Sequence, residues 1–224
     1  MLFKNIAILD ESFNVRENCY VAVDGDRISY IGEEMPLDYT GDTYDGKGKL
    51  LMSGFYNAHA HSPMALMRGY GENLPLQRWL NERIFPFEDK LDGEAVYNGT
   101  MLCMAESFRY GIVSTSDMYY FCEDMARAVV ESGAKANISR SIVNFAGIDP
   151  FKLPAMKEAE EVYGNCHNMG DGRVKIDMSL HAEYTSDPAT AKGLADFARD
   201  LDTIMHIHVS ETALEHEECI ARHG

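Results

Sequence analysis

The chain has 224 residues with a hydrophobic fraction of 46% and a charged fraction of 25%, which is typical of a globular protein with a substantial core. Its formal net charge of −16 argues against binding to nucleic acid or to an anionic membrane surface, because both need clustered Lys and Arg. No stretch reaches transmembrane length, no signal-peptide pattern opens the chain, and the five cysteines form no Cys-x-x-Cys pair, so we expect a cytoplasmic protein with reduced thiols.

The first 52 residues are predicted to form part of a small β-sandwich, distinct from residues 53–224. Residues 3–9, 20–23 and 28–31 are apolar-rich and strand-like. Asp24-Gly25-Asp26 separates the last two runs and predicts a tight hairpin, because glycine accepts the positive φ of such a turn.

After residue 61 the pattern predicts helices alternating with strands. The predicted helices cover residues 75–91 (interrupted by Pro86), 92–110, 123–132, 153–163, 187–199 and 211–222. The predicted strands cover residues 112–118, 135–145, 174–180 and 203–209. The apolar positions expected on the inner face of the second helix are Val96, Met101, Met104, Ala105 and Phe108. This alternation favours βαβ units and a parallel sheet or barrel, with about five units where a complete (β/α)8 barrel needs about 250 residues.

His59 and His61 are two residues apart in a strand-like stretch, so both imidazoles can point to the same side and reach one metal ion. Taken alone, two surface histidines are the simpler interpretation. Further polar residues, however, lie at or near the C-terminal ends of predicted strands, namely Asp117, Arg140, His181 and His208. Barrel enzymes build their active sites at that end, so the set predicts one functional rim.

Four stretches of the sequence resemble the amidohydrolase superfamily, and within it the methylthioadenosine/S-adenosylhomocysteine deaminases and their chlorohydrolase relatives. They are SGFYNAHAHSPMALMRG (53–69), Trp79-Leu80 with Pro86-Phe87-Glu88, SLHAEYT (179–185) and HIHVSET (206–212). The resemblance implies a (β/α)8 barrel with one divalent metal beside a small β-sandwich. Zinc is the expected metal and Fe²⁺ is the alternative.

The resemblance also implies a role for each matched residue. His59 and His61 correspond to metal ligands from the first barrel strand, and His208 corresponds to the ligand from the fifth. Glu211 corresponds to the proton shuttle. The residues that correspond to substrate contacts are Trp79, Glu88, Arg140 and His181, with Trp79 on the purine side and Glu88 on the ribose hydroxyls.

The sequence departs from the family pattern in several places. Ser53 stands where proline is common and Ala60 where threonine is frequent, which spares the ligands, and no second arginine follows Arg140. The sequence ends after the helix that follows the fifth strand, before the family's sixth-strand histidine and eighth-strand aspartate. We therefore expect an incomplete TIM-type α/β barrel of about five β/α units.

The expected function is that of a metal-dependent aminohydrolase. It would deaminate a purine nucleoside such as S-adenosylhomocysteine or methylthioadenosine, or a related N-heterocycle, by a metal-activated hydroxide, with Glu211 as general base and then acid. The alternatives are an inactive fragment or half of a split enzyme, or a chlorohydrolase or guanine-deaminase-like hydrolase. The expected partners are a small-molecule substrate and either a second copy of the chain or a complementing C-terminal chain, with no nucleic acid and no membrane.

Overall fold

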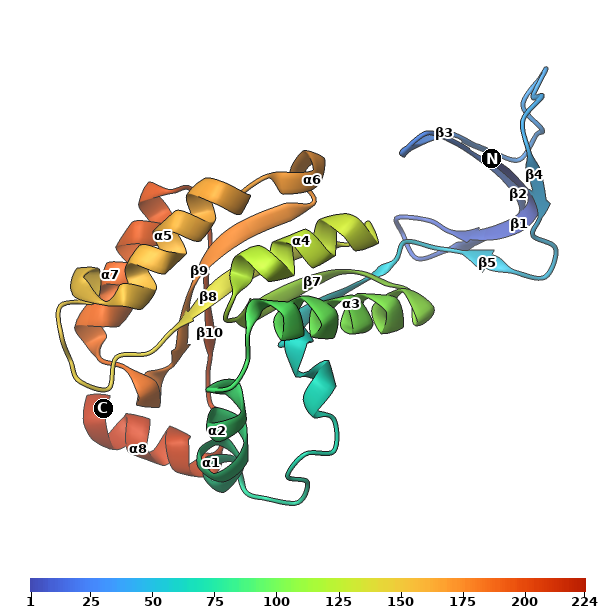
Figure 1. Ribbon diagram of the computed structural model, residues 1–224. Coiled ribbons are helices and arrows are strands. Elements are labelled where there is room, and N and C mark those ends of the chain that lie inside the picture. Colours follow the sequence, from blue (N-terminus) through green and yellow to red (C-terminus); the bar gives the residue numbers. More distant parts are fainter. The chain divides into compact units, whose positions relative to one another are not determined.

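The computed structural model describes residues 1–224 and divides into two units, Met1–Gly54 and Phe55–Gly224. The first unit is one mixed sheet in the order β3-β2-β1-β4, with β5 paired to β1 (Figure 1). Its strands are β1 (Leu2–Leu9), β2 (Val15–Asp24), β3 (Arg27–Gly32), β4 (Thr43–Asp45) and β5 (Leu50–Leu51). Asp24 pairs with Arg27 and Gly25 has a φ of +58°, which confirms the predicted hairpin.

The second unit is built on a parallel five-stranded sheet in the order β6-β7-β8-β9-β10. Its strands are β6 (Phe55–Ala60), β7 (Ile112–Tyr119), β8 (Lys135–Ile142), β9 (Val174–Ala182) and β10 (Met205–His208). Its α-helices are α1 (Leu76–Trp79), α2 (Phe85–Glu88), α3 (Gly93–Arg109), α4 (Cys122–Ser132), α5 (Pro154–Cys166), α6 (Met169–Gly172), α7 (Pro188–Asp200) and α8 (Ala213–His223). Because strands and helices alternate around one parallel sheet, the predicted α/β architecture of five units is confirmed.

The main core lies between this sheet and the helices α3, α4, α5 and α7, which pack on one of its faces (Figure 1). Ile138 pairs with Ile176 across β8 and β9, and both are fully buried in this core. Side chains alternate between the two faces of a strand, so Ser139, Ser179 and His181 face the opposite side. The opposite face of the sheet is therefore polar and carries the histidines.

Aspartate caps start two of the core helices at the expected residues. The Asp92 carboxylate accepts a 2.8 Å hydrogen bond from the Ala95 amide, and Asp187 accepts bonds from the Ala189 and Thr190 amides at 2.8 and 3.0 Å. Pro188 occupies the first turn of α7, where its missing N–H costs nothing. None of the helices is both long and apolar enough to cross a bilayer.

The inner face of α3 differs from the expected one. Val96 and Met104 are buried, Met101 is half-buried, and Ala105 and Phe108 are exposed, with 42% of Phe108 accessible. The other buried positions are small or polar, namely Gly99, Thr100 and Ser107. A search for large apolar residues misses this stripe because the helix approaches its neighbour through small side chains.

The neighbour is the short 3-10 turn Ser62–Met67 that follows His61 directly. A Cβ atom added at Gly99 would lie 2.6 Å from the Pro63 carbonyl oxygen, closer than real contacts allow. Gly99 is therefore required for the close approach of α3 to the turn behind the His-Ala-His sequence.

Pro86 was expected to interrupt the helical stretch, but the stretch continues through it. The chain forms a π-helical turn over Leu80–Ile84 and continues into α2, where Pro86 lies in the first turn. The Phe85 amide bonds to the Leu80 carbonyl, five residues back. Since Pro86 lies in the first turn of α2, its missing N–H is tolerated there.

We predict that Gly99→Ala lowers the free energy of unfolding by about 1–2 kcal/mol, because overpacking against Pro63 exceeds the gain in helix propensity. The matched control is Gly164→Ala in α5, where an added Cβ meets nothing within 4 Å and stability should rise by up to about 1 kcal/mol. Urea unfolding followed by tryptophan fluorescence measures both variants. Equal stabilisation by the two alanines would contradict the close approach.

Candidate metal centre and pocket

Three histidines from the two edge strands of the parallel sheet converge on one point. His59 lies in β6, His61 follows its last residue, and His208 ends β10. Their ring centroids form a nearly equilateral triangle with sides of 5.1, 5.0 and 5.1 Å. One potential ligand atom from each ring lies within 4.8 Å of the other two. The triangle has the size at which three imidazoles can share one cation.

Backbone carbonyls fix the tautomers of two of these rings. His61 Nδ1 donates a 2.7 Å hydrogen bond to the Met118 carbonyl, and His208 Nδ1 donates one of the same length to the His181 carbonyl. A carbonyl oxygen can only accept, so each Nδ1 carries the proton and each Nε2 keeps its lone pair. This is the second-shell arrangement that orients a metal-binding imidazole.

Burial favours the neutral form of the His61 and His208 rings. It lowers the pKa of His61 below its ordinary value, with the nearby His59 ring adding to the effect and the Met118 carbonyl opposing it. Burial likewise lowers the pKa of His208, and the His61 ring adds to that shift. Neutral imidazole is the metal-binding form, so the rings are available as ligands at neutral pH.

Asp117 secures the chain directly after His61. It is only 1% exposed and accepts hydrogen bonds from the Ser62 amide, at 3.1 Å, and from the Ser62 hydroxyl. Burial raises the pKa of Asp117 to about 6, against the lowering effect of these bonds. This predicted rim residue thus holds the turn that carries His61, and its observed bonds are to Ser62.

Glu211 follows His208 in a tight turn that Glu215 holds in place. Ser210 has a φ of +56°, and the Glu215 carboxylate accepts hydrogen bonds from the Ser210 and Glu211 amides at 3.1 and 2.6 Å. The Glu215 amide in turn donates to the Thr212 hydroxyl at 3.0 Å, which caps α8. Glu215 is only 6% exposed, and its carboxylate fixes the backbone from which the Glu211 side chain extends.

Tyr184, just after β9, and His181, near the end of β9, contribute polar groups to the same region as Glu211. The Tyr184 hydroxyl donates a 2.9 Å hydrogen bond to Glu211 Oε2. His181 Nδ1 lies 3.2 Å from the Thr185 hydroxyl, whose own proton goes to the Ala182 carbonyl, so the ring nitrogen donates and His181 Nε2 is left as an acceptor. Burial, reinforced by the His208 and His61 rings, lowers the pKa of His181 to about 4.

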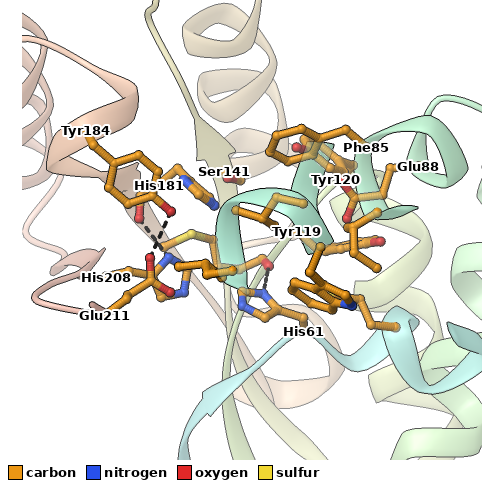
Figure 2. A pocket seen from close by; sticks show the side chains of 16 residues that line it. His61, Phe85, Glu88, Tyr119, Tyr120, Ser141, His181, Tyr184, His208 and Glu211 are labelled. Atoms are coloured by element: carbon orange, nitrogen blue, oxygen red, sulfur yellow. Dashed lines mark hydrogen bonds between the residues drawn. The ribbon is translucent and has the colours of Figure 1, made fainter. Parts of the chain in front are cut away.

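These groups line a pocket that is open to solvent (Figure 2). Figure 2 shows His181, Tyr184, His208 and Glu211 at one end and Phe85, Glu88 and Tyr120 at the other, with His61 between them. The apolar part of the wall comes from Met64, Leu76, Trp79, Leu80, Ile84 and Phe85. Burial raises the pKa of Glu88. The pocket thus joins a polar end beside the histidines to an aromatic wall and a second carboxylate.

Most of the site residues expected from the sequence come together here. His61, His208, Glu211, His181, Trp79 and Glu88 line the pocket, and His59 completes the three-histidine cluster. Arg140 does not line the pocket: its guanidinium bonds to Glu158 at 2.7 Å and lies 4.7 Å from the centre of the Tyr120 ring. Its role as a substrate contact therefore stays a prediction.

Three residues of this region were not predicted from the sequence. Tyr119 and Tyr184 line the pocket, and Glu215 supports it. The spacing Thr212-x-x-Glu215 is a capping-box signature, so Glu215 could have been found from the sequence. No spacing rule indicates the two tyrosines, because their role depends on which neighbours fold against them.

Comparison with known proteins identifies the family these motifs resemble. A model of the amidohydrolase family matches residues 50–224. A 5-methylthioadenosine/S-adenosylhomocysteine deaminase of Thermoanaerobacter pseudethanolicus is 37% identical over 100% of this chain and 52% of its own length. A 5'-deoxyadenosine deaminase of Methanothermobacter thermautotrophicus is 36% identical over 91% of this chain and 48% of its own.

A solved structure resembles this chain in its fold. An adenosine deaminase from Xanthomonas campestris with bound zinc superposes with a TM-score of 0.87 at 28% identity, covering 100% of this chain and 52% of that one. The chain thus spans about half the length of the relatives it matches.

We predict that Glu215→Ala lowers the free energy of unfolding by about 1–3 kcal/mol, because it leaves the Ser210 and Glu211 amides without their acceptor. Hydrogen exchange at these two amides should accelerate selectively. Glu217→Ala, on the exposed side of the same helix, is the control and should change neither quantity. Unchanged exchange at residues 210 and 211 in Glu215→Ala would contradict the positioning role.

Proposed function

The chain belongs to the amidohydrolase family, and we propose on that basis that it performs metal-dependent hydrolytic deamination of an adenosine-type nucleoside, with methylthioadenosine and S-adenosylhomocysteine as leading substrates. The observation that carries the proposal is the three-histidine cluster at one end of a pocket that also holds Glu211, Trp79 and Glu88. The names of the two deaminases compared above support the same substrate class.

The donor set fits one divalent cation, with zinc as the leading candidate and iron as the alternative. His59, His61 and His208 would hold it, since two of their Nε2 atoms are already freed by the Met118 and His181 carbonyls. A cation bound there supplies the Lewis acidity that makes a water molecule nucleophilic near neutral pH.

Glu211 would move the protons of the reaction. Its Oε2 is bonded to Tyr184, which leaves Oε1 to accept a proton from the attacking water and to return it to the departing amine. The net change is water plus the amino-substituted ring giving the oxo-substituted ring and ammonia. Tyr184 would restrict the carboxylate to one orientation during both transfers.

The remaining pocket residues would orient the substrate. Trp79 would offer an aromatic wall to the purine, Glu88 would accept a hydrogen bond from the sugar, and His181, which also lines the pocket, would offer Nε2 as an acceptor. Arg140 would act through Tyr120, on whose ring it lies. The same scaffold could expel a halide or act on a bare guanine, so the assay has to identify the leaving group and the ring.

The decisive test incubates the zinc-loaded chain with adenosine, methylthioadenosine and S-adenosylhomocysteine and follows ammonia release. Parallel reactions with guanine and a chlorinated triazine distinguish the alternative substrates by ammonia and halide release. Ammonia from a nucleoside supports the proposal. Nucleoside binding without turnover would mean that these residues recognise the substrate and that the 224-residue chain is inactive alone, as expected for a fragment or one half of a split enzyme.

We predict that zinc raises the melting temperature of the chain and that His59→Ala abolishes this shift, because a ligand that binds only the folded state stabilises it. A second group of donors, Glu183, Cys219 and His223, also lies within 4.8 Å. Cys219→Ser is therefore the matched control and should keep both the shift and one zinc per chain. Loss of zinc in Cys219→Ser but not in His59→Ala would place the metal elsewhere.

We predict that Glu211→Gln lowers turnover by roughly 10²- to 10⁴-fold while zinc content stays constant, because the amide cannot accept the proton of the water. Glu218→Gln, on the exposed face of α8, serves as the control. Steady-state kinetics and metal analysis on the same preparations separate a chemical defect from a loss of metal.

A further inference from the structure

One buried polar atom on the pocket wall makes no well-formed hydrogen bond within the protein. Three buried side-chain oxygens lack a hydrogen bond, Thr115 Oγ1, Ser186 Oγ and the Tyr119 hydroxyl. Of these residues only Tyr119 lines the pocket, where it is 3% exposed. Buried polar groups are almost always hydrogen-bonded, so an unpaired phenol on a pocket wall indicates a partner that arrives with the ligand.

The ring of Tyr119 is held in place by its aromatic neighbours. Its centroid lies 5.1 Å from that of Tyr120 and 6.4 Å from that of His61. Such packing fixes the direction of the hydroxyl before any ligand binds. Tyr119 thus lies between the histidine end of the pocket and the end that holds Glu88 (Figure 2).

Glu88 and Tyr119 offer complementary hydrogen-bonding groups. The Glu88 carboxylate, also on the pocket wall, can only accept when ionised, whereas the Tyr119 phenol has a proton to donate. The two groups are direct neighbours: the Glu88 carboxylate adds to burial in raising the pKa of the phenol, and the phenol opposes the burial that raises the pKa of Glu88. An alcohol hydroxyl is both donor and acceptor, so one such group could satisfy the two side chains together.

We propose that Tyr119 is a specificity-determining residue whose buried hydroxyl donates to a sugar hydroxyl of the substrate, while the proton of that sugar hydroxyl goes to Glu88. This inference rests on the proposed function and extends it, because it selects nucleosides that keep their ribose hydroxyls. Bare purines, triazines and dideoxynucleosides would leave the phenol and the carboxylate with only each other as partners, and a site built for a hydroxyl rejects ligands that lack one.

The alternative role for Tyr119 is packing alone. In that case the ring supports Tyr120 and His61, and removal of its hydroxyl affects all ligands alike. A phenylalanine at this position keeps the ring and removes only the hydroxyl, so Tyr119→Phe separates the two roles.

The test measures the dissociation constants of adenosine and 2',3'-dideoxyadenosine for the zinc-loaded chain. Glu211→Gln is the common background, which prevents turnover during the titration. Trp79 is the only tryptophan in the chain and lines the pocket, so its fluorescence reports binding directly. In this background Tyr119→Phe should raise the dissociation constant of adenosine about 10-fold, as expected for one lost hydrogen bond. The dissociation constant of dideoxyadenosine should change less than about 2-fold.

The matched control is Tyr97→Phe, which removes a phenol that bonds to Glu131 on the exposed side of α3 and should change neither constant. Equal weakening of both ligands by Tyr119→Phe, or no change in either, would overturn the role of the hydroxyl while leaving the proposed function intact. Absence of nucleoside binding to the zinc-loaded Glu211→Gln chain would instead overturn the proposed substrate class, and the inference with it.

Discussion

The site depends first on the curvature of the parallel sheet. β6 and β10 are its two edge strands, with three strands between them. In a flat sheet with strands about 4.8 Å apart, these edges would lie about 19 Å from each other. The His59 and His208 rings are nevertheless only 5.0 Å apart. The helices packed on the outer face and the twist of the strands therefore do more than build a core, because the resulting curl assembles the three-histidine cluster.

Once the edges meet, backbone groups prepare the cluster for a ligand. The carbonyls of Met118 and His181 belong to β7 and β9, the direct neighbours of the strands that carry His61 and His208. Each therefore sets the tautomer of an imidazole on the adjacent strand. The Ser62 turn, held by Asp117 and packed against Gly99, adds a further constraint on the segment that carries His61. The Met118 carbonyl, the Asp117 carboxylate and the close approach at Gly99 thus all constrain the position of His61.

The sequence contained the parts of this arrangement that follow from local rules. The two-residue period of a strand placed His59 and His61 on one side, the aspartate caps started helices correctly, and the turn glycine located the hairpin. The prediction of the inner face of α3 was partly wrong, because Gly99 and Thr100 are buried there and pack closely through their small size. The unpaired phenol of Tyr119 and the reach of Glu215 back to residue 210 depend on tertiary neighbours, which periodicity does not encode.

The π-helical turn at Leu80–Ile84 has a consequence for how the pocket wall is composed. Trp79 and Glu88 are nine positions apart, and in an unbroken α-helix with 3.6 residues per turn such residues point to opposite sides. Both nevertheless line the same pocket. The wider turn changes the rotational phase between the halves of the helix, so the length of this segment governs whether the tryptophan and the carboxylate face one ligand together. Insertion or deletion of a single residue there would rotate one recognition group away from the other and alter substrate range without replacing any side chain that touches the substrate.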